Sequence, residues 1–320
     1  MSEEQVIDLH GRPVTYRVAG PESGPVIVLV HGIANTAASF VDTPDLLADS
    51  LGVRVIAPDL FRRGESHEID TDTSLGGRAA VIRDLMVALH IPSATLIGHS
   101  LGGGVSLQFS YLFPRRVERL VLVASGGLGR EVTPILRYAT LPGSELLLSL
   151  LGSRVAQKAS AAVDKSIDVA AVLAPDRFQP SHKETTRSVS SLADAALRAS
   201  FVSTARHVLD RNGQRISALD RLYLAAHVPV LLIHGSKDRI IPAQHSIQGH
   251  EAIAHSRLEI IEGAGHFPHL DCADTFVELV GDFLSTTEPA HVDDDELARI
   301  LAERSDEPDV LPPPAPSLGA

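Results

Sequence analysis

The stretch from 94 to 104 constrains the fold more than any other part of this 320-residue chain. It begins as an apolar run and continues as Gly98-His99-Ser100-Leu101-Gly102, after which apolar residues recur at helical spacing. This order predicts a strand, a sharp turn and a helix, with the Ser100 hydroxyl held above the sheet edge. A side chain at Gly98 or Gly102 would collide with the neighbouring strand or helix. The helix would direct its N-terminal amides at an oxyanion formed beside the serine.

Apolar runs of strand length alternate with helical patterns over most of the chain. Residues 5–19 predict two outer antiparallel strands, because apolar and polar side chains alternate there. Later runs are continuously apolar, which is typical of strands buried on both faces; they lie at 26–30, 53–59, 94–98, 120–124, 228–233 and 258–261. Helical spacing marks 40–49, 75–89 and 273–284. The expected fold class is α/β, a doubly wound and mostly parallel sheet.

The apolar runs of strand length stop at 126 and return after about 222. The intervening residues are rich in Ala, Leu and Ser, with helical stretches near 144–163 and 188–210. We interpret 126–221 as a helical cap inserted into a core made of 1–125 and 222–285. A cap over the strand ends would enclose a substrate cavity and exclude water.

Residues 286–320 change in character and predict a separate tail. They hold nine acidic and two basic residues, and therefore −7 of the net charge of −12. A short helix is expected at 293–303, and the proline-rich end should be disordered. A partner-binding role for this tail is the alternative to a solvated one.

Composition excludes several classes of function. The balance of 28 basic against 40 acidic residues offers no basic patch, so we expect no nucleic-acid partner. No apolar run approaches the roughly 20 residues of a membrane span. The acidic N-terminus lacks a signal core, which favours a cytoplasmic protein. Cys272 is the single cysteine, so no internal disulfide can form. No cluster has metal-ligand spacing, and the oligomeric state is left open.

Three chemically complementary residues each follow a predicted strand: Ser100, Asp238 and His266. In a parallel sheet the carboxyl ends of the strands share one edge, so these side chains should meet. A serine hydroxyl needs a base to become nucleophilic, and a carboxylate orients that base. We therefore predict nucleophile, acid and base in that chain order. The backbone amides of Ile33 and Leu101 are the predicted oxyanion hole.

Other residues compete for these roles. His269 is the nearest rival base among fifteen histidines, and three more histidines follow strands beside a glycine or the serine: His31, His99 and His234. Asp271 and Asp59 are rival acids, one entering a helix and the other on a strand remote from the histidine loop. Arginines in the loop at 62–66 could bind an anionic substrate group, although a solvated loop is the commoner interpretation.

At these residues the sequence resembles the α/β-hydrolase superfamily over about 5–285, in its serine-nucleophile, esterase- or lipase-like branch with an inserted helical cap. The matching motifs are His31-Gly32, Gly98-His99-Ser100-Leu101-Gly102-Gly103, His234-Gly235-Ser236-Lys237-Asp238 and Gly263-Ala264-Gly265-His266. The resemblance implies the same triad and needs no cofactor or metal. It also implies that the segment from 126 to 221 is the cap.

Departures from related branches narrow the function. Haloalkane dehalogenases and epoxide hydrolases of this fold carry Asp where Ser100 stands, and the chain has no tryptophan with which dehalogenases bind halide. Carbon–carbon bond hydrolases usually have Asn and Trp where His99 and His234 stand. The leading prediction is a serine hydrolase acting on a small or medium carboxylic ester through an acyl-enzyme. A carbon–carbon hydrolase acting on a diketo-acid ring-cleavage product and a non-catalytic ligand-binding protein are the alternatives.

Overall fold

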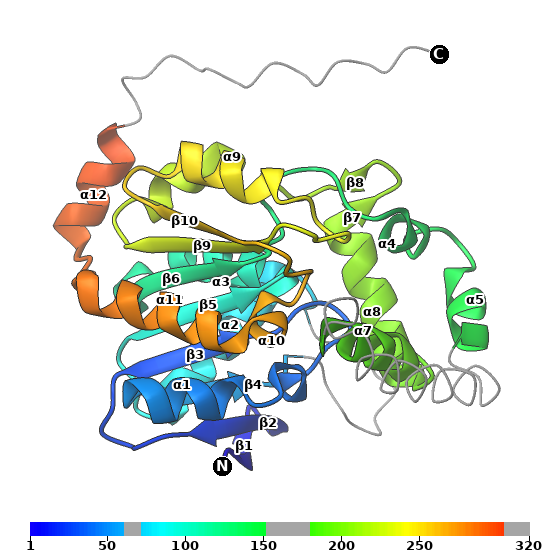
Figure 1. Ribbon diagram of the computed structural model, residues 1–320, viewed down its shortest axis with the longest axis horizontal. Helices are drawn as coiled ribbons and strands as arrows, with labels where there is room; N and C mark the ends of the chain where they lie inside the picture. The colour runs from blue at the N-terminus through cyan, green and yellow to red at the C-terminus, as the bar shows by residue number, and fades with distance from the viewer. Residues whose placement is uncertain (61–71, 152–179, 304–320) are drawn as a thin grey trace.

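The computed structural model describes residues 1–60, 72–151 and 180–303 (Figure 1). The predicted loop at 62–66, the middle of the predicted cap at 152–179 and the end of the predicted tail at 304–320 lie outside these residues.

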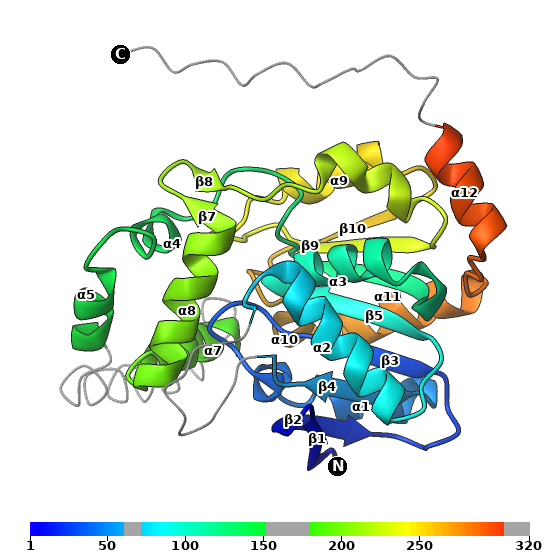
Figure 2. The ribbon, with the colours of Figure 1, turned by 180° about the vertical axis from the view of Figure 1, so that it is seen from behind.

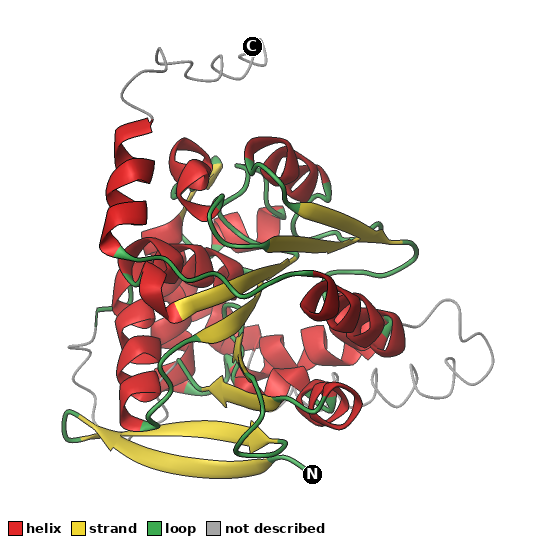
Figure 3. Cartoon of the chain, turned by 90° about the vertical axis from the view of Figure 1, so that its left-hand side faces the viewer, coloured by secondary structure: helices red, strands yellow, loops and turns green. Residues whose placement is uncertain are grey.

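An eight-stranded sheet organises the described chain, in the order β1-β2-β4-β3-β5-β6-β9-β10. Its strands are β1 (Glu3–Leu9), β2 (Arg12–Ala19), β3 (Val26–Val30), β4 (Arg54–Pro58), β5 (Ala94–His99), β6 (Val117–Val123), β9 (Val230–Gly235) and β10 (Arg257–Ile261). The hairpin β1–β2 is antiparallel and β2 joins β4 antiparallel, whereas the other six strands are mutually parallel. The hairpin forms one edge of the molecule (Figure 3). The predicted mostly parallel α/β sheet is confirmed.

Helices cover both faces of the sheet. On one face lie α1 (Thr43–Leu51) and α11 (Ala273–Thr286), and on the other α2 (Leu75–Ala88), α3 (Leu101–Leu112) and α9 (Gln244–Ala252) (Figures 1 and 2). Alternate residues of a central strand serve the two cores. Ile27 and Leu29 of β3 pack beneath α1 and α11, and Val28 and Val30 pack on the α2 side. This two-sided burial explains the continuous apolar strand sequences.

Short helices complete the core layers. They are η1 (Ala37–Phe40), η2 (Pro114–Arg116), η4 (Leu219–Ala225) and α10 (Pro268–Asp271). The expected helix at 40–49 is therefore divided between η1 and α1, separated by Val41, whose φ of +50° breaks the helical path.

The segment between β6 and β9 contains α4 (Pro134–Tyr138), α5 (Ser144–Leu151), α7 (Pro180–Ser191) and α8 (Ala195–Val208). These helices lie beyond one end of the sheet (Figure 2). The helix expected at 188–210 was wrong in its bounds, because Asp194 caps a new helix by accepting from the amides of Ala196 and Leu197. An unpredicted two-stranded hairpin follows, β7 (Leu209–Asp210) and β8 (Gly213–Gln214). The assignment of the whole segment as a cap stays a prediction.

The C-terminal part contains the expected short helix, α12 (Asp294–Glu303). The connection before it is anchored to the core, because buried Arg119 of β6 donates from Nε to Thr287 Oγ1 at 2.8 Å. None of the helices in the described ranges combines the length and apolar character that crossing a bilayer requires.

Candidate active site

Ser100 occupies the sharp turn between β5 and α3. Its φ of +55° lies in a region that L-residues rarely adopt. Two backbone hydrogen bonds join this turn to the end of β6 and the residues that follow it. Ser100 N donates to Val123 O at 2.9 Å, and Gly126 N donates to Ser100 O at 2.8 Å. The predicted need for glycine is confirmed. A Cβ at Gly98 would lie 2.4 Å from Gly102 O, and one at Gly102 would lie 2.0 Å from Val30 O.

Asp238 and His266 meet at the same edge of the sheet, from the loops after β9 and β10. His266 Nδ1 donates to Asp238 Oδ2 across 2.7 Å, and the carboxylate is fully buried. The second carboxylate oxygen accepts from the amides of Ile240 and Ile241, at 2.7 and 3.1 Å. With its Nδ1 protonated, His266 keeps Nε2 as a free base.

His234 is a second donor to the same carboxylate. Its Nε2 lies 3.0 Å from Asp238 Oδ2, and its Nδ1 lies 2.7 Å from the Ser246 hydroxyl. Burial alone would raise the pKa of Asp238. The nearby charge of His266 and the hydrogen bonds from His234 and His266 instead hold that pKa well below its ordinary value. Asp238 is therefore ionised throughout the neutral range.

Ser100 and His266 are linked through His99. The residue before the serine directs Nε2 at the carbonyl oxygen of His266, 2.8 Å away, and the two imidazole rings lie 4.9 Å apart. In the described part of the chain, no hydrogen bond joins the Ser100 hydroxyl to His266. Such contacts are commonly long before substrate binds. His99 thus brings the loop of His266 against the turn of Ser100.

The predicted oxyanion donors also border Ser100. Ile33, Leu101 and Ser100 line one cavity. Gly32 packs so closely that a Cβ there would lie 3.1 Å from Ser100 Cβ. Within the described residues, neither the Ile33 nor the Leu101 amide donates to a backbone or side-chain acceptor. Two amides beside a serine hydroxyl can stabilise a tetrahedral oxyanion.

Three of the rival histidines, His31, His99 and His269, are buried, and burial lowers the pKa of each. Burial lowers the pKa of His31 to about 4, and its ring contacts Gly32 O and Leu60 N. Burial, with the neighbouring His269 and His266, lowers the pKa of His99 well below its ordinary value. Burial lowers the pKa of His269 to about 3, and among the described residues neither of its ring nitrogens has a hydrogen-bond partner. Within the described residues, none of these three contacts Asp238 within hydrogen-bond distance, whereas His234 does.

The two rival acids accept hydrogen bonds from backbone amides. Asp59 accepts from the amide of Ala37 at 2.6 Å. Asp271 accepts from Gly265 N at 2.8 Å with one oxygen and from Ser181 N at 3.0 Å with the other. Asp271 therefore joins the loop of His266 to the start of α7.

A small cavity of about 50 Å³ lies next to Ser100. Its described lining is apolar or glycine except for Ser100 and Gln214. It joins residues at strand ends to the segment between β6 and β9; from that segment come Val132, Leu136, Val208 and Ile216. This lining suits an uncharged, aliphatic group.

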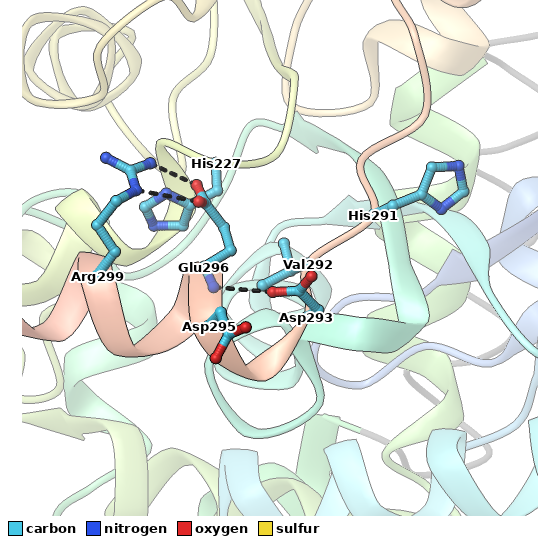
Figure 4. Close-up of a pocket in the computed structure, with 7 residues that line it drawn as sticks. All are labelled: His227, His291, Val292, Asp293, Asp295, Glu296 and Arg299. Carbon is cyan, nitrogen blue, oxygen red and sulfur yellow. Dashed lines mark hydrogen bonds and ion pairs between the residues drawn. The ribbon is translucent and has the colours of Figure 1, made fainter.

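A larger hollow of about 450 Å³ lies elsewhere, on α12 (Figure 4). His227, His291 and acidic side chains line it, and Arg299 pairs with Glu296 at its rim. Within the described ranges no group of three or more His, Cys, Asp and Glu side chains could hold a metal ion, this hollow included. Size alone therefore does not locate the chemistry.

Comparison with known proteins places this geometry in a family. The family model described as alpha/beta hydrolase fold matches residues 25–273. An uncharacterized protein of Mycobacterium tuberculosis is 38% identical over 304 residues, covering 92% of this chain and 84% of that protein. A 2-hydroxymuconate semialdehyde hydrolase of Pseudomonas sp. (strain CF600) is 30% identical, covering 84% and 90%. The chain belongs to the α/β-hydrolase fold family.

Solved structures agree on the fold. A 2-hydroxy-6-oxo-6-phenylhexa-2,4-dienoate hydrolase from Rhodococcus sp. strain RHA1 superposes with a TM-score of 0.67 at 21% identity, covering 89% of this chain and 99% of that one. An esterase from Rhodococcus sp. ECU1013 gives 0.64 at 22%, covering 89% and 98%. Similar folds thus occur in an esterase and in a dienoate hydrolase, so the substrate class of this chain must be argued from its site.

Sequence reasoning missed two contacts at this site. It treated His234 as a rival base, whereas the ring donates to Asp238. Their spacing of four residues across the turn after β9 was the available signal. It did not single out Gln214, because nothing in a helical-looking segment marks a hairpin residue that will face the serine turn.

Proposed function

We propose that the protein is a serine hydrolase that cleaves a small or medium carboxylic ester through an acyl-enzyme. The observation that carries this proposal is the buried Asp238–His266 pair, 2.7 Å apart, at the sheet edge where Ser100 occupies its strained turn. A buried carboxylate that fixes the histidine tautomer is what a serine nucleophile requires. His99 supports the pairing by binding the main chain of His266 beside Ser100.

In this mechanism Ser100 Oγ attacks the ester carbonyl while His266 Nε2 takes its proton. The amides of Ile33 and Leu101 stabilise the oxyanion, and loss of one such donor typically raises the barrier by about 3–4 kcal/mol. The imidazolium, stabilised by Asp238, protonates the departing alcohol. Water, deprotonated by His266, then attacks the acyl carbonyl. The bond between the acyl carbon and Ser100 Oγ breaks, His266 returns the proton to Oγ, and the carboxylic acid leaves. Every step uses groups of the chain, and none calls for a metal or cofactor.

We also propose that the segment from 126 to 221 covers the site as a cap. Helix α7 supports this role, because it binds both loops that flank the serine. Ser191 Oγ donates to Ala34 O at 3.4 Å, next to Ile33, and Ser181 N reaches Asp271. The hydroxyl of Ser188 also donates to the amide oxygen of Asn35. A helix held in this way would exclude water from an acyl-enzyme.

The ester is favoured over the carbon–carbon substrate by the charge of the cavity. A diketo acid carries a carboxylate that needs a cationic partner, and no Lys, Arg or His is among the described residues that line the cavity. The second candidate function, carbon–carbon hydrolysis, is favoured by the 30% identity to the semialdehyde hydrolase.

Turnover of two substrate types separates these candidates. We would measure kcat/KM for p-nitrophenyl esters from acetyl to decanoyl and for a 2-hydroxy-6-oxohexa-2,4-dienoate, with the Ser100→Ala variant as control. Ester turnover that is lost in Ser100→Ala, with little turnover of the dienoate, is the expected result. The reverse ranking would replace the ester proposal by the second candidate.

A further inference from the structure

His234 lies near the end of β9, directly against the carboxylate of Asp238, and its side chain is fully buried. Its Nε2 lies 3.0 Å from Asp238 Oδ2 and 3.0 Å from Ile241 O. Both of these oxygens are acceptors, because Asp238 is ionised, so Nε2 carries a proton and donates to both. His234 therefore fastens the loop that carries Asp238 at two points.

Helix α9 fixes the tautomer of this ring. The helix packs against β9 (Figure 1), and its Ser246 hydroxyl lies 2.7 Å from His234 Nδ1. When the ring proton is on Nε2, Nδ1 is an acceptor and the hydroxyl donates to it. Ser246 is itself fully buried, so water does not compete for this contact. The N–H of His234 is thereby directed at Asp238.

One oxygen of Asp238 is shared between two imidazoles. His266 Nδ1 lies 2.7 Å from Oδ2 and His234 Nε2 lies 3.0 Å from it, whereas Oδ1 accepts from two backbone amides. A hydrogen bond donated to a carboxylate stabilises its charge and makes it a weaker base. The bond from His234 therefore weakens the attraction of Oδ2 for the proton and the developing positive charge of His266.

We propose that His234 is a positioning residue that acts through Asp238 and sets the pH range in which His266 works as the base. This role rests on the proposed serine hydrolase function. The base must be unprotonated when Ser100 attacks, and a carboxylate that has lost one donor stabilises the protonated ring more strongly. Loss of the His234 donor should therefore move the acid limb of the rate profile to higher pH. A residue that only filled space would change the rate by the same factor at every pH.

Other titratable groups face this cluster from three elements: His99 of β5, His269 of α10 and His245 of α9. Burial lowers the pKa of all three below the ordinary histidine value. Glu131 pairs with His245 at 2.8 Å, and that hydrogen bond lowers the pKa of the Glu131 carboxyl. These four groups therefore do not account for a transition that moves upward from about pH 6.5.

The rate at which a fluorophosphonate labels Ser100, followed from about pH 5 to about pH 9, tests the proposal. Labelling needs an activated serine and does not depend on whether an ester or a carbon–carbon bond is the natural substrate. His234→Phe keeps an aromatic ring and removes the donor, whereas His234→Gln offers an amide N–H in place of Nε2–H. The midpoint of the acid limb should rise by about 0.5–1 pH unit in His234→Phe and stay within about 0.3 unit of the parent in His234→Gln.

His250→Phe is the matched control. His250 also belongs to a histidine–serine pair on α9, with Nδ1 lying 2.8 Å from Ser256 Oγ, and this contact does not involve Asp238. The variant loses a pair of the same kind, so it should keep the midpoint within about 0.3 pH unit of the parent.

Nitrogen-15 NMR of the histidine side chains in the parent decides the question if His234→Phe does not fold. The proposal predicts the Nε2–H tautomer for His234, with an N–H resonance that moves as His266 becomes protonated, because both donors share Oδ2. A His234 resonance that stays constant through that transition would overturn the inference.

Two results with folded His234→Phe would overturn it as well. One is an unchanged midpoint, and the other is a loss of rate that is equal at every pH. Failure of the proposed function gives a different result, which is absence of labelling in the parent at every pH. The NMR titration would then still decide whether His234 and His266 share the carboxylate.

Discussion

Replacing Asp238 by asparagine should remove most of the turnover while preserving the shape of the site. The asparagine oxygen can still accept from the amides of Ile240 and Ile241, as Asp238 Oδ1 does. Its amide nitrogen would then face His266 Nδ1 and His234 Nε2, both of which donate to Oδ2 in the parent. Two donors cannot share a hydrogen bond, so the His266 proton moves to Nε2. That tautomer cannot accept the proton of Ser100.

The size of the effect follows from this lost tautomer. We expect kcat to fall about 10⁴-fold, the magnitude associated with a triad histidine held in the wrong tautomer. The variant should also lose about 3 kcal/mol of unfolding free energy at pH 7, because hydrogen bonds to a charged acceptor contribute about 1.5–3 kcal/mol each. The folded-state pKa of Asp238 is lowered, so this stabilisation is present above pH 5 and is lost as the pH falls below about 4.

The assay is single-turnover ester hydrolysis combined with urea unfolding at pH 7 and pH 3.5. Asp271→Asn is the matched control, because this rival carboxylate binds the amides of Gly265 and Ser181 and does not touch His266. It should lower kcat by about tenfold or less while also reducing stability. The reasoning is refuted if Asp238→Asn keeps kcat within tenfold of the parent, or if both variants lose turnover equally.

Two predictions concern stability alone. Gly98→Ala should unfold the protein or cost several kcal/mol, about 3 or more, because its Cβ would lie 2.4 Å from Gly102 O. Gly76→Ala, whose Cβ meets nothing closer than 3.7 Å in α2, should instead raise the unfolding free energy by up to about 1 kcal/mol; similar melting temperatures for the two variants would contradict this. His269→Phe should reduce the decrease in unfolding free energy that the parent shows as the pH falls. The folded-state pKa of about 3 lies below the unfolded value, so His269 costs about 1.4 kcal/mol per pH unit as the pH falls below 6.5; parallel curves of unfolding free energy for variant and parent between pH 7 and pH 4 would exclude this.

The fold was accessible from sequence because its strands are buried on both faces. A strand such as β3 places Ile27 in one core and Val28 in the other, so every position is apolar and the run is easy to recognise. The segment between β6 and β9 gave weaker signals. Its helices have mixed composition, and the break between α7 and α8 depends on a single cap, Asp194. The hairpin ending at Gln214 is too short to show alternation.

The candidate site also has residues that the sequence could predict and contacts that it could not. Ser100, Asp238 and His266 each follow a strand, so topology alone was enough to place them at one edge. The hydrogen-bond partners of the residues around this triad could not be predicted from the sequence. These contacts join loops that are distant along the chain. Asp271 was weighed as an acid, and its bonds to Gly265 and Ser181 emerge only from the positions of α7 and α10.

The central claim is that Ser100 is a nucleophile activated by His266, and covalent labelling tests it most directly. The protein would be treated with a fluorophosphonate, and the modified peptide located by mass spectrometry beside Ser100→Ala and His266→Ala. The account predicts one adduct on Ser100, absent in the first variant and formed at least about a hundredfold more slowly in the second. Labelling of another residue, or labelling at Ser100 that is as fast in His266→Ala as in the parent, would contradict it.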